Sequence, residues 1–280
     1  MDEVTLARAR REFGLEGEPA PLPGGTRQTY RVGDAVLKQI RETSLENNHS
    51  PELAAWLAGV FAGVAEAGFR VPRPRATRDG AWITGDGWTA AMFVEGVHAT
   101  AADIPAAIAA IVAFHRALRG VAKHPLMDDN RTPWGKADRW CWDDRPAWVH
   151  PAVAGAVDRL YALRRPVGGL TDQLVHGDLN PENILIAPGR PPAFLDMSPF
   201  WRPVEFALAI FANFIGPRQG DRAVLRHFAG VAHFDQLLVR AGIRMLLVMS
   251  ELGDLDDWAN CSERWAAEII VRHVEGRDDT

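Results

Sequence analysis

The segment LVHGDLNPENILI, residues 174–186, constrains the fold more than any other part of the chain. Two acids, two asparagines and a histidine stand between apolar runs that favour burial. A second apolar run, AFLD, follows after the turn APGRPP. We therefore expect two short strands joined in a hairpin. His176, Asp178 and Asn183 would then lie on the loop entering the first strand, with Asp196 at the end of the second.

Such a hairpin brings Asn183 and Asp196 to the same end, within reach of one metal ion. Asparagine and aspartate oxygens are hard ligands that suit magnesium. Asp178 stands five residues before Asn183, where the loop can present it to a substrate hydroxyl. A carboxylate that orients and deprotonates a nucleophile, and two oxygen ligands for the metal on the phosphates, are the parts that phosphoryl transfer needs. The alternative is a merely structural turn, because Asp and Asn favour turns.

The composition excludes several other classes of protein. The chain has 280 residues, 47% hydrophobic and 24% charged, with a formal net charge of −5. It has no long basic run, so nucleic acid is not an expected partner. Cys141 and Cys261 provide neither a disulfide framework nor a zinc ligand set. The start, MDEVTLARARREF, is not a signal peptide, and apolar stretches such as PVEFALAIFANFIG are too short to span a membrane. We expect a cytoplasmic protein without a membrane partner.

Strand patterns dominate before residue 95, and helical patterns dominate after residue 100. Residues 1–14 predict a short helix, and TYRV and AVLKQI predict a hairpin that turns at Gly33-Asp34. Residues 50–67 predict a helix with Ser50 as N-cap, Pro51 at its first position and Gly68 past its end. AWITGDGWTAAMFV predicts a second hairpin. The pattern indicates an α+β fold with a small lobe over residues 1–95, a larger helical lobe over residues 96–280, and a cleft between them.

The sequence HGDLNPENIL closely resembles the catalytic loop of the aminoglycoside phosphotransferase and choline kinase-like family, whose members are relatives of protein kinases. The resemblance implies a protein-kinase-like two-lobe fold. It also implies Asp178 as catalytic base, Asn183 as a metal ligand, and Asp196 as the counterpart of the metal-binding aspartate of protein kinases. His176 would brace the loop. Mg²⁺ and ATP or GTP are the implied cofactors.

The first half of the chain carries further matching features. Only three of the 31 basic residues are lysine, which is typical of a GC-rich bacterial coding sequence. A lysine on an apolar strand is therefore unexpected in this chain. The resemblance implies that Lys38 contacts the α- and β-phosphates of the nucleotide. Glu52, in the first turn of the predicted helix, is the best candidate to pair with Lys38, and Glu46 is the second. The alternatives are an ordinary edge-strand lysine and a first-turn acid that favours the helix dipole.

The resemblance assigns two more segments to the nucleotide. Gly24 and Gly25 with Thr26 would form a reduced glycine-rich loop over the phosphates. Residues 92–96, including Met92 and Val94, would form the linker between lobes, where adenine bonds to backbone groups. The chain departs from protein kinases after Asp196, where it reads Met-Ser-Pro-Phe instead of Phe-Gly. LDMSPFWRP resembles phosphotransferase-like proteins of actinobacteria more than known resistance enzymes.

The expected activity is magnesium-dependent transfer of the γ-phosphoryl group of ATP or GTP to a hydroxyl of a small molecule. A sugar, an amino sugar, an amino alcohol and an antibiotic all remain open as acceptor. The alternative is a nucleotide-binding, pseudokinase-like regulatory module without turnover. Two groups of side chains have both a substrate-binding and a structural interpretation. These are Trp134, Trp140, Trp142 and Trp148, and the acids Glu251, Asp254, Asp256 and Asp257.

Overall fold

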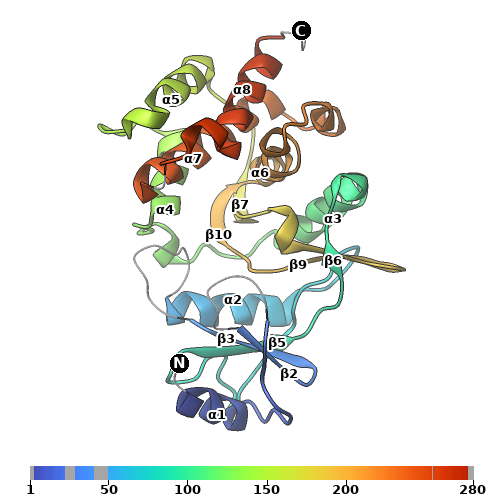
Figure 1. Cartoon of the computed structure of the whole chain (residues 1–280). Helices are drawn as coiled ribbons and strands as arrows, with labels where there is room; N and C mark the ends of the chain where they lie inside the picture. The colour runs from blue at the N-terminus through green and yellow to red at the C-terminus, as the bar shows by residue number, and fades with distance from the viewer. Residues whose placement is uncertain (1–2, 23–28, 41–49, 254, 277–280) are drawn as a thin grey trace.

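The computed structural model describes residues 3–22, 29–40, 50–253 and 255–276. The strand-rich part of the chain forms one lobe and the helical part forms a second, larger lobe (Figure 1). Helix α1 (Glu3–Glu12) and helix α8 (Ser262–Val274) lie at opposite ends of the molecule. The elements of the first lobe are α1 (Glu3–Glu12), β1 (Ala20–Pro21), β2 (Thr29–Val32), β3 (Ala35–Gln39), α2 (Pro51–Gly63), β4 (Pro74–Arg75) and β5 (Trp88–Met92).

The first lobe is built on an antiparallel sheet with the strand order β1-β2-β3-β5-β4. The predicted hairpin at Gly33-Asp34 forms, and Gly33 has the positive φ of 60° that such a turn requires. The second predicted hairpin is wrong in its pairing. β5 pairs with β3 and β4, and only an isolated bridge joins Ile83 to Thr89. Trp88 and Ala90 of β5 are buried in the small core together with residues of β2 and β3.

Helix α2 begins as predicted and ends four residues early. The Ser50 hydroxyl accepts a hydrogen bond from the Leu53 amide at 3.0 Å, and Pro51 is the first helical residue. The last helical residue is Gly63, because Arg73 donates from Nη1 to the carbonyl of Phe61 at 2.9 Å and so satisfies the end of the helix. Gly68, with a φ of 85°, belongs to the turn that follows.

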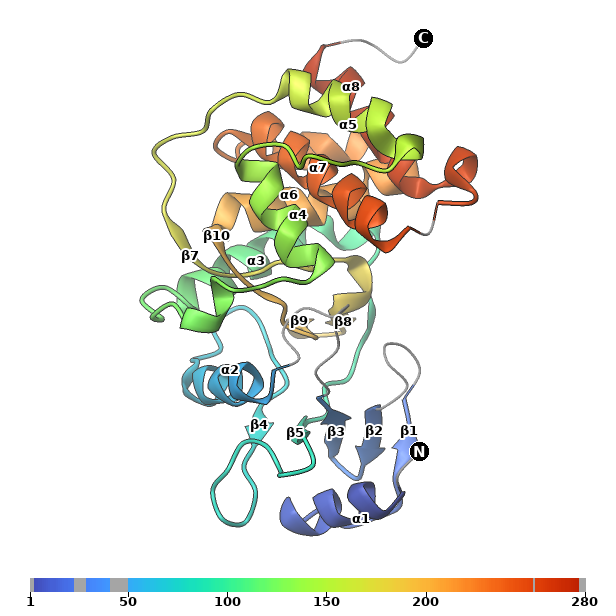
Figure 2. The same cartoon turned by 90° about the vertical axis from the view of Figure 1, so that its left-hand side faces the viewer.

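The second lobe is mainly helical, with two small sheets on the side that faces the first lobe (Figure 2). These sheets have the strand orders β6-β8-β9 and β10-β7. The elements in chain order are β6 (Val97–His98), η1 (Ala101–Asp103), α3 (Ile104–Ala117), η2 (Pro125–Met127), α4 (Pro133–Trp142), α5 (Pro151–Leu163), β7 (Asp172–His176), η3 (Pro181–Asn183), β8 (Ile184–Ala187), β9 (Arg190–Phe194), β10 (Pro199–Pro203), α6 (Val204–Ile215), η4 (Pro217–Gln219), η5 (Ala223–Phe228), α7 (Phe234–Leu252), η6 (Trp258–Asn260) and α8 (Ser262–Val274).

Two hydrophobic cores hold the lobes. The smaller one packs α1 against the sheet of the first lobe, on the side away from the second lobe. The larger one fills the helical lobe and also receives the apolar face of α2, where Phe61 lies 6.2 Å from Phe114 of α3 between ring centroids. Helix α2 is thus attached to both lobes. In the part of the chain that the structure describes, no helix is both long enough and apolar enough to cross a membrane.

Candidate phosphotransfer site

The hairpin expected from the sequence forms from β8 and β9. Ile184 is opposite Phe194, and the amide of Leu195 donates to the carbonyl of Asn183 at 2.9 Å. This pairing places Asn183 and Asp196 at the same end of the hairpin. Just before β8, the side chain of Asn180 caps the short helix η3 by accepting from the amide of Asn183 at 3.0 Å. The polar residues of the loop are therefore used to hold its backbone.

Asp178 lies half-buried in this loop, with both carboxylate oxygens oriented by amides. Oδ1 accepts from Asn180 Nδ2 at 3.2 Å, and Oδ2 accepts from Asn183 Nδ2 at 3.1 Å. Asn183 Nδ2 also donates to the carbonyl of Asp178 at 2.8 Å. Each carboxylate oxygen has two lone pairs, so each keeps one for a further donor, such as a substrate hydroxyl.

Two buried histidines brace the loop from behind. His176 accepts the amide of Asp178 on Nδ1 at 3.1 Å and donates from Nε2 to the carbonyl of Leu195 at 2.9 Å. His115 of α3 accepts the amide of His176 on Nε2 at 3.1 Å and donates from Nδ1 to the carbonyl of Ile111 at 2.7 Å. The chain of bonds links α3 to the backbone of Asp178 and to the residue before Asp196. His115 had no role in the sequence interpretation, since its signal is only a histidine on an apolar helix face.

Both histidines must be neutral for this arrangement, because each ring uses one nitrogen as donor and the other as acceptor. Burial lowers the pKa of His115 to about 3. Burial also lowers the pKa of His176, against the opposing effect of the nearby Asp178 carboxylate. The rings are therefore held as fixed tautomers at neutral pH.

Gly177, between His176 and Asp178, has no room for a side chain. A Cβ built on it would lie 2.0 Å from Cδ2 of Phe200. The amide of Gly177 donates to the carbonyl of Ser198 at 2.8 Å, which keeps β10 against the loop. The glycine of HGD is thus required by the packing of Phe200, which the sequence alone does not reveal.

Asp196 leaves the end of β9 in a left-handed conformation, with a φ of 47°. This region is strained for most residues and tolerated best by Asn and Asp. The turn directs its carboxylate to the first lobe, where Oδ1 lies 2.8 Å from Lys38 Nζ. Lys38 is on β3, which has strand neighbours on both sides, so it is not an edge-strand lysine. The pair joins the two lobes.

The partner expected for Lys38 from the sequence does not meet it. The Glu52 carboxylate lies 3.7 Å from His124 Nε2, and its side chain is 73% exposed. Among the described residues, the ion pair of Lys38 is with Asp196 instead. Ring packing explains the position of Glu52, since Trp56 on the next turn of α2 holds His124 at 5.2 Å between centroids. Glu46, the second candidate, and Gly24, Gly25 and Thr26 lie outside the described residues.

The expected linker follows β5 directly. Met92 is the last residue of that strand, and its amide donates to the carbonyl of Arg73 at 2.8 Å. The next amide, of Phe93, donates to the carbonyl of Asp34 at 2.7 Å. Val94 comes after these anchored residues and before Gly96, at which a Cβ would lie 2.8 Å from Cβ of Leu185. The chain therefore passes from one lobe to the other along β8, close to the hairpin of the site.

The tryptophan-rich segment packs into the fold for the most part. Trp134, Trp140 and Trp142 are partly buried against the large core, whereas Trp148 is 59% exposed. Of the acids considered for a cationic substrate, Glu251 is paired with Lys136 at 2.7 Å.

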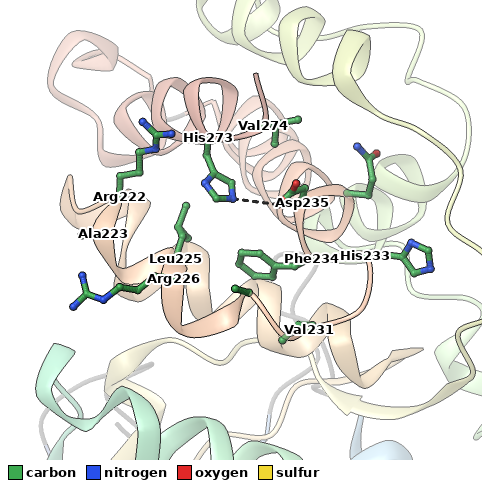
Figure 3. A pocket seen from close by; sticks show the side chains of 12 residues that line it. Arg222, Ala223, Leu225, Arg226, Val231, His233, Phe234, Asp235, His273 and Val274 are labelled. Atoms are coloured by element: carbon green, nitrogen blue, oxygen red, sulfur yellow. Dashed lines mark hydrogen bonds and ion pairs between the residues drawn. The ribbon is translucent and has the colours of Figure 1, made fainter. Parts of the chain in front are cut away.

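A hollow on the surface lies away from this site. It measures about 1050 Å³ and is lined by residues of η5 and by the ends of α7 and α8 (Figure 3). His273 and Asp235, which are 3.1 Å apart, close one side of it. None of its lining residues belongs to the loop or the hairpin described above.

Asn183 and Asp196, at the end of the hairpin, carry oxygen atoms of the kind that bind magnesium. Asn183 directs its amide nitrogen to Asp178, which leaves the amide oxygen free of that contact. Asp196 uses Oδ1 for Lys38 and is exposed. An amide oxygen and a carboxylate are donors that Mg²⁺ prefers, and it takes its other ligands from phosphates and water.

Two lobes joined by a linker, a strand lysine paired with an aspartate of the other lobe, and a braced Asp178–Asn183 loop define a protein-kinase-like fold. Comparison with known proteins gives the family. The profile of the phosphotransferase enzyme family, APH, matches residues 19–237, and the chain belongs to this family of phosphotransferases. None of the curated proteins compared with the chain matches it.

Solved structures share the fold at low sequence identity. The apo form of a thermostable mutant of aminoglycoside phosphotransferase APH(4)-Ia is 19% identical, with a TM-score of 0.57 over 96% of this chain and 98% of that chain. Choline kinase LicA from Streptococcus pneumoniae is 15% identical, with a TM-score of 0.58 over 96% and 98%. A choline/ethanolamine kinase family protein from Mesorhizobium loti is 21% identical, with a TM-score of 0.53 over 97% and 93%.

Proposed function

We propose that the chain transfers the γ-phosphoryl group of ATP or GTP to a hydroxyl of a small molecule, with Asp178 as the catalytic base. The observation that carries this proposal is the Asp178 carboxylate, which two asparagine amides orient while one lone pair on each oxygen stays available. Asp178 accepts the proton of the acceptor hydroxyl as its oxygen attacks the γ-phosphorus, and the bond to the β,γ-bridging oxygen breaks.

The other residues position and neutralise charge. Asn183 and Asp196 would hold Mg²⁺, which when bound offsets the negative charge that develops on the phosphate oxygens. Lys38 would contact the α- and β-phosphates, and its bond to Asp196 holds it beside the residues proposed to bind the metal. His176 and His115 keep the backbone of Asp178 fixed, so that the loop needs no rearrangement when the acceptor binds. Gly24, Gly25 and Thr26 would cover the phosphates, and Met92 and Val94 would border the adenine.

Relatives with this fold support nucleotide use. A thermostable mutant of APH(4)-Ia, 16% identical to this chain, was solved as a ternary complex with ADP and hygromycin B. Another mutant was solved with AMP-PNP and hygromycin B. A regulatory module without turnover is the rival function. The presence of Lys38, Asp178, Asn183 and Asp196 near one end of the β8–β9 hairpin favours the enzyme, because binding alone requires no base at residue 178.

The test is release of ADP or GDP with magnesium and pooled hydroxyl compounds, with wild type beside Asp178→Asn. The exchange keeps an acceptor oxygen for the loop amides and removes the base. We expect release from at least one pool, a loss of at least about 100-fold in kcat for Asp178→Asn, and unchanged nucleotide affinity.

Glu182→Gln is the matched control, because Glu182 is an exposed acid of the same loop. It should release product as wild type does. Equal turnover by Asp178→Asn and wild type would remove Asp178 from the role of base. Nucleotide binding without release from any pool would favour the regulatory module.

A further inference from the structure

The first lobe joins the second through two chain segments that lie side by side. One is the linker that follows β5, and the other is the connection between α2 and β4. Pro74 of β4 is opposite Ala91 of β5, and the amide of Met92 donates to the carbonyl of Arg73 at 2.8 Å. The two segments are thus bonded to each other where they leave the sheet of the first lobe.

The connection between α2 and β4 also adds to the sheet of the candidate site. The amide of Arg70 donates to the carbonyl of Pro192 in β9 at 2.9 Å, and the carbonyl of Arg70 accepts from the amide of Phe194 at 3.0 Å. The neighbours of Arg70 in the chain, Phe69 and Val71, are buried in the large core of the second lobe. The backbone at residue 70 is therefore fixed to the hairpin that leads to the metal end of the site.

The side chain of Arg70 ties the linker to this hairpin. Nε donates to the carbonyl of Pro191 at 2.7 Å, and Nη1 donates to the carbonyl of Glu95 at 3.2 Å. Pro191 and Pro192 have no amide N–H, so this part of β9 offers only carbonyl groups to a neighbour. A guanidinium is planar with its donors in a fixed fork, so it can hold carbonyls of two segments at a set distance.

The linker has no other fixed point between Glu95 and the next strand, β6. β6 pairs with β8, and Gly96 stands between it and Glu95. Glycine has the widest backbone freedom of any residue. The bond from Arg70 to the carbonyl of Glu95 therefore prevents the linker from pivoting at Gly96.

The two segments that Arg70 joins belong to different ends of the proposed nucleotide site. Glu95 is in the linker, which the proposed function places at the adenine. β9 leads to Asp196, which the proposed function places at the metal, with Lys38 beside it at 2.8 Å. A single ligand that contacts both ends gains affinity from its second contact only when the distance between the ends matches the ligand. A fixed distance also removes the cost of ordering the ends on binding.

We propose that Arg70 is a positioning residue of the nucleotide site, which sets the distance between the adenine end at the linker and the phosphate end at Asp196. This inference rests on the proposed function and goes beyond it, because Arg70 acts through the linker and β9 without a role in the reaction itself. Its removal leaves the groups of each end in place and loosens the spacing between them. A ligand that fills one end is then bound as before, whereas a ligand that spans both ends is bound less tightly.

The test compares one spanning ligand with its two parts. Calorimetric titration of the full chain, as wild type and as Arg70→Met, uses magnesium–ATP or magnesium–GTP, the corresponding nucleoside, and magnesium tripolyphosphate. We expect Arg70→Met to raise the Kd of the magnesium–nucleotide about tenfold and to change the Kd of the nucleoside and of tripolyphosphate by less than about twofold. In turnover, the KM of the nucleotide should rise by the same factor, with the KM of the acceptor unchanged.

Arg73→Met is the matched control from the same connection. Arg73 donates from Nη1 to the carbonyl of Phe61 at 2.9 Å, and its Nε pairs with Glu66 at 3.0 Å. Like Arg70→Met, it breaks two contacts and should lower the Tm. Neither of its partners belongs to the linker or to β9, so its affinity for the magnesium–nucleotide should equal that of wild type.

Arg70→Lys keeps the charge and the apolar stem, and it takes the place of Arg70→Met if methionine prevents folding. It lacks the planar fork, so it should also weaken binding of the magnesium–nucleotide more than binding of either part. Wild-type affinity in the Arg70 variants, with a lowered Tm, would make Arg70 a structural residue and overturn the proposal. An equal loss for nucleoside and nucleotide also overturns it, because Arg70 would then shape the adenine end alone. A wild type that binds neither nucleotide overturns the proposed function and the positioning role with it.

Discussion

At the scale of single residues, the lack of space beside Gly177 leads to a specific prediction. Gly177→Ala places a Cβ against the ring of Phe200, which is held on its other side by Arg244. The loop or the ring must move, and we expect a loss of about 1–3 kcal/mol in the free energy of unfolding. Urea unfolding measures this loss, and turnover should fall with it because Asp178 is the next residue.

Gly155→Ala is the control for Gly177→Ala. Gly155 lies in α5 with no atom within 4 Å of a built Cβ. Alanine should stabilise that helix by about 0.5–1 kcal/mol. An unfolding free energy that is unchanged in Gly177→Ala would show that the loop accommodates a methyl group and that the glycine serves another purpose.

The buried histidines predict how stability depends on pH. The pKa of His115 is about 3 in the fold and about 6.5 in the unfolded chain, so the unfolded chain binds more protons between these values. As far as His115 is concerned, the free energy of unfolding therefore has its full value above about pH 6.5 and decreases as the pH is lowered toward 3. His115 alone accounts for a loss of about 2 kcal/mol between pH 7.5 and pH 5. His176, whose pKa is also lowered, adds to the loss.

Urea unfolding at both pH values measures this effect. His115→Gln should be less stable at pH 7.5, because the amide of His176 loses its acceptor, and should show a flatter dependence on pH. A variant that keeps the full pH dependence would contradict the assignment of the loss to His115.

At the scale of elements, local patterns were sufficient for the features that depend on neighbouring residues. The hairpin at Gly33-Asp34, the cap at Ser50 and the β8–β9 hairpin follow from turn chemistry and alternation. The pairing of β5 and the end of α2 do not, because they depend on β4 and on Arg73, which are distant in sequence. The Glu52 hypothesis fails for the same reason, since Trp56 and His124 determine where the start of α2 docks.

The site shows the same division. The closeness of Asp178, Asn183 and Asp196 in space was predictable because one short segment contains them. The bracing by His115 and the requirement for glycine at residue 177 depend on contacts between segments that are distant in sequence, so no local sequence pattern predicts them.

The N-cap of α2 gives a prediction at this scale. Ser50→Ala removes the acceptor of the Leu53 amide and should cost about 1 kcal/mol of unfolding free energy. Ser50→Asp keeps an acceptor and should retain the stability of wild type. Chemical denaturation of the two variants measures the difference, and equal stability would show that water replaces the cap at no cost.

At the scale of the whole molecule, the two lobes meet through contacts of different kinds. The apolar face of α2 packs into the large core, and this burial holds the lobes together. The Lys38–Asp196 pair also joins the lobes, but its side chains are 29% and 57% exposed. An ion pair this exposed contributes little to stability. Its position between the lobes agrees with the proposed function, in which Asp196 would hold the metal and Lys38 would contact the phosphates.

The variant Lys38→Met distinguishes a role of this ion pair in holding the lobes together from a role of Lys38 in nucleotide binding. Because the pair is exposed, the free energy of unfolding should change by less than about 1 kcal/mol. Because a phosphate contact is lost, the Kd for magnesium–nucleotide should rise at least about tenfold. Lys136→Met is the control, since it removes the ion pair with Glu251 inside the helical lobe and should leave nucleotide affinity unchanged. Calorimetric titration with magnesium–ATP and magnesium–GTP measures both variants. Wild-type affinity in Lys38→Met would make the lysine a link between lobes and nothing more.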